Sequence, residues 1–209
     1  MNRKLDIENW ARKDHFNFFK EFDEPFWGVT VDLDCTGTYL KCKEKGYSFF
    51  LYYLHLSLKA ANSLEPFRYR IVGDDVIVFD QVNASPTINR PDGTFGFAYM
   101  EFKERFNEFE KLAQTEITRI QSSKGLVPAI SGENVIHYSS IPWVKFTSLS
   151  HARSFSFPDS CPKISFGKMV EDQDKRKIMP VSIHGHHGLM DGYHVGQYIE
   201  SFQDLLNGA

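Results

Sequence analysis

The sequence predicts an α/β protein of the α+β two-layer sandwich type, in which helices cover a large mixed, mostly antiparallel sheet. The chain has 209 residues, the usual size of one domain with a substantial core, so we expect a single domain over residues 1–209. Strand and helix patterns follow one another in mixed order with hairpins, rather than in strict alternation. One helix pattern, at residues 49–64, is apolar nearly all round, which is typical of a deeply buried helix.

The first third of the chain contains one strand pattern among three helix patterns. An aromatic stripe marks the first helix, and alternation of apolar residues marks the strand. Gly46 ends the second helix, and Ser48 is placed to cap the third. The expected segments are a helix over residues 7–20, a strand over 26–35, a helix over 36–45 and the buried helix over 49–64.

The middle of the chain begins with a hairpin. The turn sequence Gly73-Asp74-Asp75 separates strand patterns at residues 67–71 and 76–79. Residues 94–102 are aromatic and strand-like, and residues 103–123 carry apolar side chains at helical spacing.

The last third is rich in loop signals and contains three further strand patterns. The first lies at residues 135–141, within a loop-rich stretch over 126–162. Two more, at residues 164–170 and 178–187, flank a charged hairpin loop. Asp191 can then cap a final helix over residues 192–206.

Composition excludes several classes of protein. A net charge of -3 argues against a large nucleic-acid footprint, and no apolar run approaches the ~20 residues that cross a bilayer. The N-terminus lacks the apolar stretch of a secretory signal. The three cysteines are odd in number and lack zinc-site spacing, so we expect reduced thiols in a cytoplasmic protein. Nineteen phenylalanines predict an aromatic core, an apolar pocket or a subunit interface.

Four of the eight histidines lie within residues 184–194, where a strand pattern meets a helix pattern. Strand alternation places His187 on the apolar face, and His184 and His186 on the other. Three interpretations are open on these residues alone. His184 and His186 can share a metal ion with His194 or Asp191, one histidine can act as a general base, or the histidines have no chemical role.

A sequence motif narrows this choice. Residues 186–192, His-His-Gly-Leu-Met-Asp-Gly, match the pattern His-His-x-x-x-Asp-Gly. This pattern resembles the signature of the coenzyme A-dependent acyltransferases, which include the chloramphenicol acetyltransferases and the catalytic domains of dihydrolipoamide acyltransferases. Residues 9–16, 139–144 and 191–196 also resemble segments of the chloramphenicol acetyltransferases. The resemblance extends over essentially the whole chain.

The resemblance implies an acetyl-CoA-dependent O-acetyltransferase that needs no metal and no bound cofactor, with acetyl-CoA as co-substrate. His187 would be the general base, Ser139 the oxyanion donor, and Asp191 a structural partner of Arg12. The acceptor would contact Phe19, Phe95, Leu149 and Ser165, and the coenzyme would contact Trp143 and Lys168. The family further implies a homotrimer with active sites between subunits. The charge and the lack of a long apolar run predict neither a nucleic acid nor a membrane as partner.

The sequence departs from the family mainly in the acceptor region. Phe19 stands where a tyrosine is usual, Leu149 stands where a phenylalanine is usual, and residues 23–27 do not match the pocket-lining segment. Chloramphenicol is therefore the first expectation for the acceptor, and another hydroxyl compound or a thiol is the alternative. A more remote alternative is a non-catalytic protein that binds a metal or ligand through His184, His186 and His194.

Overall fold

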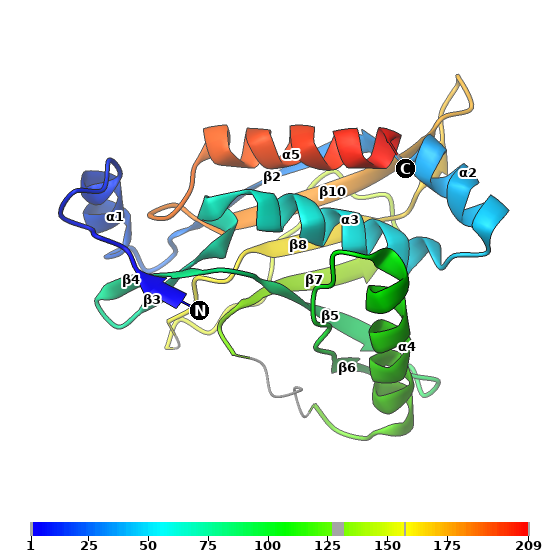
Figure 1. The fold of residues 1–209 in the computed structure, drawn as a ribbon, viewed down its shortest axis with the longest axis horizontal. Coiled ribbons are helices and arrows are strands. Elements are labelled where there is room, and N and C mark those ends of the chain that lie inside the picture. Colours follow the sequence, from blue (N-terminus) through cyan, green and yellow to red (C-terminus); the bar gives the residue numbers. More distant parts are fainter. Residues whose placement is uncertain (1, 127–131, 157, 209) are drawn as a thin grey trace.

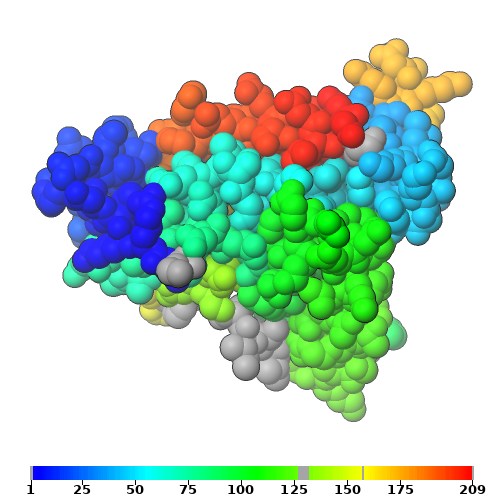
Figure 2. Space-filling view, viewed as in Figure 1, coloured from blue at the N-terminus to red at the C-terminus, as the bar shows by residue number. Residues whose placement is uncertain are grey.

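The computed structural model describes residues 2–126, 132–156 and 158–208. A mixed sheet forms one layer, and helices α3 and α5 lie side by side across one of its faces (Figure 1). Figure 2 views the molecule from this side, where α5 (red), α3 (cyan) and α4 (green) cover the sheet. None of the helices in the described parts of the chain has the length and apolar character needed to cross a bilayer.

The helices and strands have the following bounds. The helices are α1 (Lys13–Phe19), α2 (Thr36–Lys45), α3 (Phe49–Ser63), the 3-10 helix η1 (Glu65–Arg68), α4 (Phe106–Ser122) and α5 (Gly192–Asn207). The strands are β1 (Asn2–Lys4), β2 (Phe26–Asp34), β3 (Tyr69–Val72), β4 (Asp75–Phe79), β5 (Asn83–Asn89), β6 (Phe95–Phe97), β7 (Val135–Ile141), β8 (Lys163–Gly167), β9 (Val170–Glu171) and β10 (Lys177–His186).

Among the described residues, the strands form two sheets. The larger has the order β2-β10-β8-β7-β5-β6, with β9 paired to β10, and the smaller has the order β1-β4-β3. Strand β7 runs parallel to both of its neighbours, β5 and β8, and the other strand pairs are antiparallel. The predicted mixed, mostly antiparallel sheet covered by helices is thus confirmed.

The register of the central strands separates their two faces. Tyr138, Ile164 and Ile183 are paired neighbours on β7, β8 and β10, and all three belong to the buried core beneath the helices. The next positions along the strands therefore point to the opposite face. These positions form a row of hydroxyl side chains across the same three strands, Ser139, Ser165 and Ser182.

The structure corrects the sequence interpretation in several places. The first two residues of the predicted strand 67–71 belong to η1, and the predicted strand 164–170 is divided into β8 and β9. Helix α1 begins at Lys13 rather than at residue 7, because residues 7–12 form turns that pack Ile7 and Trp10 against the small sheet. Strand β5 was not predicted: its sequence is polar and contains Pro86, which usually disfavours an interior strand. The strand-like stretch 94–102 contributes only β6 and one isolated bridge, Ala84 to Met100.

Candidate active site

His187 directly follows strand β10, and two backbone hydrogen bonds fix its position. Its amide donates to the carbonyl oxygen of Pro25, at 2.8 Å, just before β2 begins. Its carbonyl oxygen accepts from Arg12 Nη2, at 3.0 Å, next to the start of α1. Three segments that are distant in the sequence therefore meet at this residue.

Aromatic rings surround the His187 imidazole. Phe19, the last residue of α1, stacks on it with ring centroids 4.0 Å apart and an interplanar angle of 10°. The Trp27 ring lies 5.4 Å away at 39°. Nδ1 of His187 is buried and has no hydrogen-bond partner among the described residues. The imidazole thus has an apolar, largely water-excluded setting on this side.

The loop after His187 folds back onto β10. The amides of Leu189 and Met190 both donate to the carbonyl oxygen of His186. Met190 packs over Gly185, where an added Cβ would lie 2.4 Å from the Met190 sulfur. Trp27 Nε1 donates to the Met190 carbonyl oxygen at 3.2 Å. A Cβ at position 185 would force the Met190 side chain to shift, so glycine lets Met190 pack closely over the end of β10.

Asp191 ends this loop and caps α5. One carboxylate oxygen accepts from the amide of Tyr193 and lies 2.8 Å from His194 Nδ1, and the other pairs with Arg12 Nη1. Burial alone would raise the pKa of Asp191, but the hydrogen bond and charge of Arg12, together with His194, lower it below its ordinary value. Asp191 is therefore an ionised carboxylate that ties the loop to the segment before α1.

The other histidines of the cluster have separate surroundings. Nδ1 of His186 accepts from the amide of Gly188, and burial, with the charge of Arg153, lowers the pKa of His186 to about 4. His184 lies on the opposite face from the helices, 3.4 Å from Ser182 Oγ. Within the described residues, His184, His186 and His194 do not form a set that could share a metal ion.

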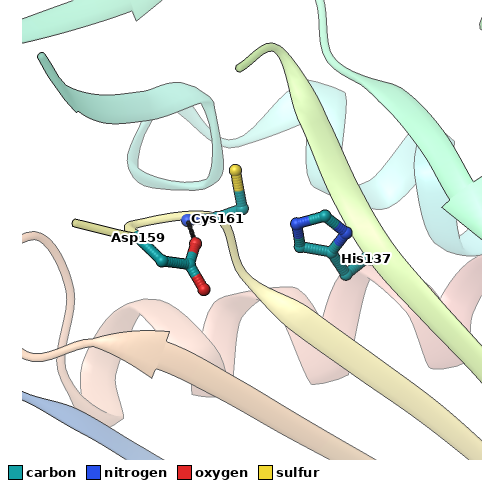
Figure 3. A group of neighbouring side chains, drawn as sticks. All are labelled: His137, Asp159 and Cys161. Carbon is teal, nitrogen blue, oxygen red and sulfur yellow. Dashed lines mark hydrogen bonds between the residues drawn. The ribbon is translucent and has the colours of Figure 1, made fainter. Parts of the chain in front are cut away.

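A different set of potential metal ligands includes His137, which lies two residues before Ser139 on β7. His137, Asp159 and Cys161 have ligand atoms within 4.8 Å of one another, and Asp159 also accepts the Cys161 amide (Figure 3). Lys163 pairs with Asp159 and donates to the Cys161 carbonyl oxygen. Burial raises the pKa of the Cys161 thiol, which opposes thiolate formation. The Lys163 ammonium already supplies the cation here, so the set does not favour a metal.

Ser139 and Ser165 lie opposite each other on β7 and β8. Ser139 is partly exposed, whereas Ser165 is fully buried and its hydroxyl has no partner among the described residues. Phe95 lies on β6 at the sheet edge and is exposed. Leu149 lies in the loop after β7, where its backbone bonds the His184 ring. Among the described residues, Phe19 therefore lies with His187, apart from the paired Ser139 and Ser165.

An apolar groove of about 550 Å³ opens at the end of strands β7 and β8, between α3 and α4. Its lining is mostly apolar: Phe49, Phe50, Tyr53, Thr87, Ile88, Asn89, Ile117, Gln121, Ser140, Pro142, Gly167, Lys168, Met169 and Met179. Trp143, exposed on the turn after β7, follows the lining residue Pro142, and the Lys168 amide donates to the Val144 carbonyl oxygen at 2.9 Å. Sequence reasoning did not find this groove, because the apolar pattern of α3 predicts only burial.

His187 and Ser139 lie far apart within one chain. Ser182 shares a row with Ser139, and His187 is five residues further along the chain. At about 3.3 Å per residue this is a separation of roughly 16 Å along the strand, with two strand spacings of about 4.8 Å across the sheet. Figure 1 shows the same arrangement, with the end of β10 next to α1 and the end of β7 next to α4. A single chain therefore does not bring these two groups together.

Comparison with known proteins shows which family this chain belongs to. The family model described as chloramphenicol acetyltransferase matches residues 1–203. A chloramphenicol acetyltransferase of Bacillus pumilus is 31% identical over 208 residues, which cover 99% of this chain and 94% of that protein. Chloramphenicol acetyltransferase 3 of Escherichia coli is 28% identical, covering 98% of this chain and 96% of that protein.

Solved structures agree with the sequence comparison. A chloramphenicol acetyltransferase structure superimposes with a TM-score of 0.90 at 30% identity and covers 99% of this chain and 100% of that chain. A probable dihydrolipoamide acetyltransferase from Listeria monocytogenes reaches a TM-score of 0.70 at 16% identity, covering 95% of this chain and 90% of that chain, so it shares the fold.

Proposed function

Since the chain belongs to the chloramphenicol acetyltransferase family and is an acetyl-CoA-dependent O-acetyltransferase, we propose that it transfers the acetyl group to a hydroxyl of chloramphenicol. The observation that supports this most is the combination of a full-length family match with the fixed His187 loop. The proposal assigns roles to the two groups that a single chain keeps apart.

We propose that His187 is the general base. Phe19 and Trp27 hold the imidazole in place, and in the tautomer that carries its proton on Nδ1 the ring has Nε2 free to accept a proton. The acceptor hydroxyl gives its proton to Nε2 as its oxygen attacks the thioester carbonyl of acetyl-CoA. The C–S bond then breaks, the carbonyl re-forms, and the proton passes from His187 to the departing coenzyme A sulfur.

Ser139 is the proposed oxyanion donor. The tetrahedral intermediate places negative charge on the former carbonyl oxygen, and a fixed hydroxyl donor stabilises it by ~3 kcal/mol. The partial exposure of Ser139 in one chain leaves its hydroxyl accessible to a substrate. Nothing covalent forms on the protein in this scheme.

The separation of His187 from Ser139 supports a homo-oligomeric active site. Both groups act on the same tetrahedral centre only if they come from different copies of the chain. Phe18 and Phe22 support this arrangement, because they are exposed apolar side chains that pack on Phe19 beside His187. We therefore propose a homotrimer, in which His187 of one subunit faces the serine row of the next.

The apolar groove is the proposed site of the coenzyme arm. Its mostly apolar lining suits the pantetheine chain, and it includes Ser140, which directly follows the proposed oxyanion donor in strand β7. Lys168 lines the groove and supplies a positive charge for the coenzyme phosphates, and exposed Trp143 offers a ring face to its base. Acetyl-CoA is thus a co-substrate rather than a resident cofactor.

One observation favours a second acceptor. Phe19 lies against His187 without a hydroxyl of its own, so this wall of the site offers no hydrogen bond to a polar acceptor. The alternative is the same transfer to a less polar hydroxyl compound, or to a thiol such as dihydrolipoamide. We also propose a cytoplasmic location, which the free, buried thiols of Cys35, Cys42 and Cys161 support.

Release of the coenzyme A thiol, followed with a thiol-reactive dye, tests this proposal. Wild-type protein is expected to release thiol from acetyl-CoA when chloramphenicol is added, and His187→Ala is expected to lose at least ~10³-fold in kcat because the base is absent. Full rate in His187→Ala would show that the base assignment is wrong. Turnover with other hydroxyl compounds or dihydrolipoamide, but not with chloramphenicol, would select the second acceptor class.

A further inference from the structure

The residues on either side of Ser139 are both bonded to helix α3. Strand alternation directs Tyr138 and Ser140 toward the helices, while Ser139 points to the other face. Ser140 Oγ and Tyr53 OH share a hydrogen bond of 3.0 Å. Ser57 Oγ donates to Tyr138 OH at 3.1 Å. Tyr53 and Ser57 lie one turn apart on the same face of α3, so the helix holds β7 on both sides of Ser139.

Tyr53 contacts the neighbouring strand as well. Its ring lies 4.6 Å from that of Phe166, which pairs with Ser140 in the register of β7 and β8. Phe166 directly follows Ser165, the buried serine opposite Ser139. A single side chain therefore touches the residue after Ser139 and the residue after Ser165.

The Tyr53 hydroxyl is suited to a fixed bond rather than to proton transfer. Burial raises the pKa of Tyr53, so the phenol keeps its proton. The ring is 7% exposed, and the hydroxyl bond to Ser140 takes place at the wall of the apolar groove, which both residues line. A buried hydroxyl with one defined partner restricts how far that partner moves.

We propose that Tyr53 is a positioning residue, which holds β7 so that the Ser139 hydroxyl points at the oxyanion. The inference rests on the proposed function, because it assigns Tyr53 to the action of Ser139. Tyr53 acts through Ser140 and the strand, and does not itself touch the reacting atoms. The physical reason is that a donor to a transition state loses much of its effect when it shifts by a fraction of an ångström.

The test uses Tyr53→Phe, which removes only the hydroxyl and keeps the ring against Phe166. We expect kcat to fall about tenfold with both KM values within about twofold of wild type, since geometry rather than binding changes. In a Ser139→Ala background, Tyr53→Phe should not lower kcat further. Tyr52→Phe is the matched control: Tyr52 is the neighbouring residue, is also 7% exposed, and its hydroxyl has no hydrogen bond among the described residues.

Three kinetic results would overturn the proposal. The first is a full kcat in Tyr53→Phe. The second is an equal fall of kcat in the Ser139→Ala background, which would mean that Tyr53 acts independently of Ser139. The third is a raised KM for acetyl-CoA with an unchanged kcat, which would make the hydroxyl a coenzyme contact.

Hydrogen exchange supplies a readout that does not depend on activity. The peptide covering residues 135–141 is expected to exchange faster in Tyr53→Phe than in wild type, and to be unchanged in Tyr52→Phe. Unchanged exchange in both variants would overturn the positioning role. If wild-type protein transfers acetyl to no acceptor, the proposed function fails, and the exchange result alone then decides whether Tyr53 holds the strand.

Discussion

Replacing Arg12 by alanine tests how the base is held in place. The substitution removes the partner of Asp191 and the donor to the His187 carbonyl oxygen. Removing one partner of a fully buried ion pair costs about 3–5 kcal/mol. The Arg12 side chain is 12% exposed and that of Asp191 is 32% exposed, so solvent screens part of the loss, and we expect about 2 kcal/mol.

This loss has two measurable consequences. A destabilisation of about 2 kcal/mol lowers the melting temperature by about 4–8 °C in a chain of this size. Because the loop that carries His187 is then free to shift, kcat is expected to fall about 10²-fold. Arg12→Lys keeps the charge but not the two-nitrogen fork of the guanidinium. Its melting temperature and kcat should therefore lie between those of wild type and Arg12→Ala. Lys13→Ala, which removes an exposed pair with Glu8 next door, should change neither quantity.

The stabilisation of the folded state by the Arg12–Asp191 ion pair should decrease as the pH falls. The folded-state pKa of Asp191 lies below its ordinary value of 3.8, so the pair stabilises the protein above that pH and loses its effect as pH falls through the folded pKa. The difference in unfolding free energy between wild type and Arg12→Ala should therefore be full at neutral pH and shrink below about pH 4. Normal melting together with normal kinetics in Arg12→Ala would refute the pairing argument.

Two further predictions concern Lys168 in the apolar groove and the potential metal ligands His137, Asp159 and Cys161. Lys168→Ala should raise KM for acetyl-CoA about tenfold, because a phosphate contact is lost, and leave KM for acetyl-pantetheine unchanged; equal rises for both would contradict a role at the phosphates. Protein purified without a histidine tag should contain no stoichiometric zinc by elemental analysis, and chelators should not alter its activity, since Lys163 already neutralises Asp159. One zinc per chain, lost on changing Cys161, would contradict this.

Much of the fold could be predicted from the sequence. The bounds of α2 and α3 follow from Gly46 and Ser48, because Gly46 adopts the left-handed conformation that ends a helix and Ser48 accepts the amide of Leu51. The strand and helix around the histidine cluster follow from alternation and from the Asp191 cap. In these segments local chemistry and tertiary packing favour the same structure.

The remaining features depend on contacts that a linear pattern does not contain. Strand β5 carries Pro86, yet it forms because β6 and β7 pair with it on its two sides. The first helix begins late because Trp10 packs against Tyr69, with ring centroids 5.4 Å apart, which favours turns over helix in residues 7–12. The resemblance to the acyltransferases identifies His187 and Ser139 as candidate residues, but only the strand register reveals that one chain separates them.

A mixed-subunit experiment tests the shared active site most directly. His187→Ala and Ser139→Ala chains, carrying different tags, are co-expressed, and oligomers that contain both are isolated by two affinity steps. If the base and the oxyanion donor come from different subunits, a mixed oligomer contains some interfaces with an intact His187 and an intact Ser139. We predict that its kcat per chain recovers to a substantial fraction of wild type, far above either parent. Activity no greater than the average of the two parents would contradict an active site built between subunits.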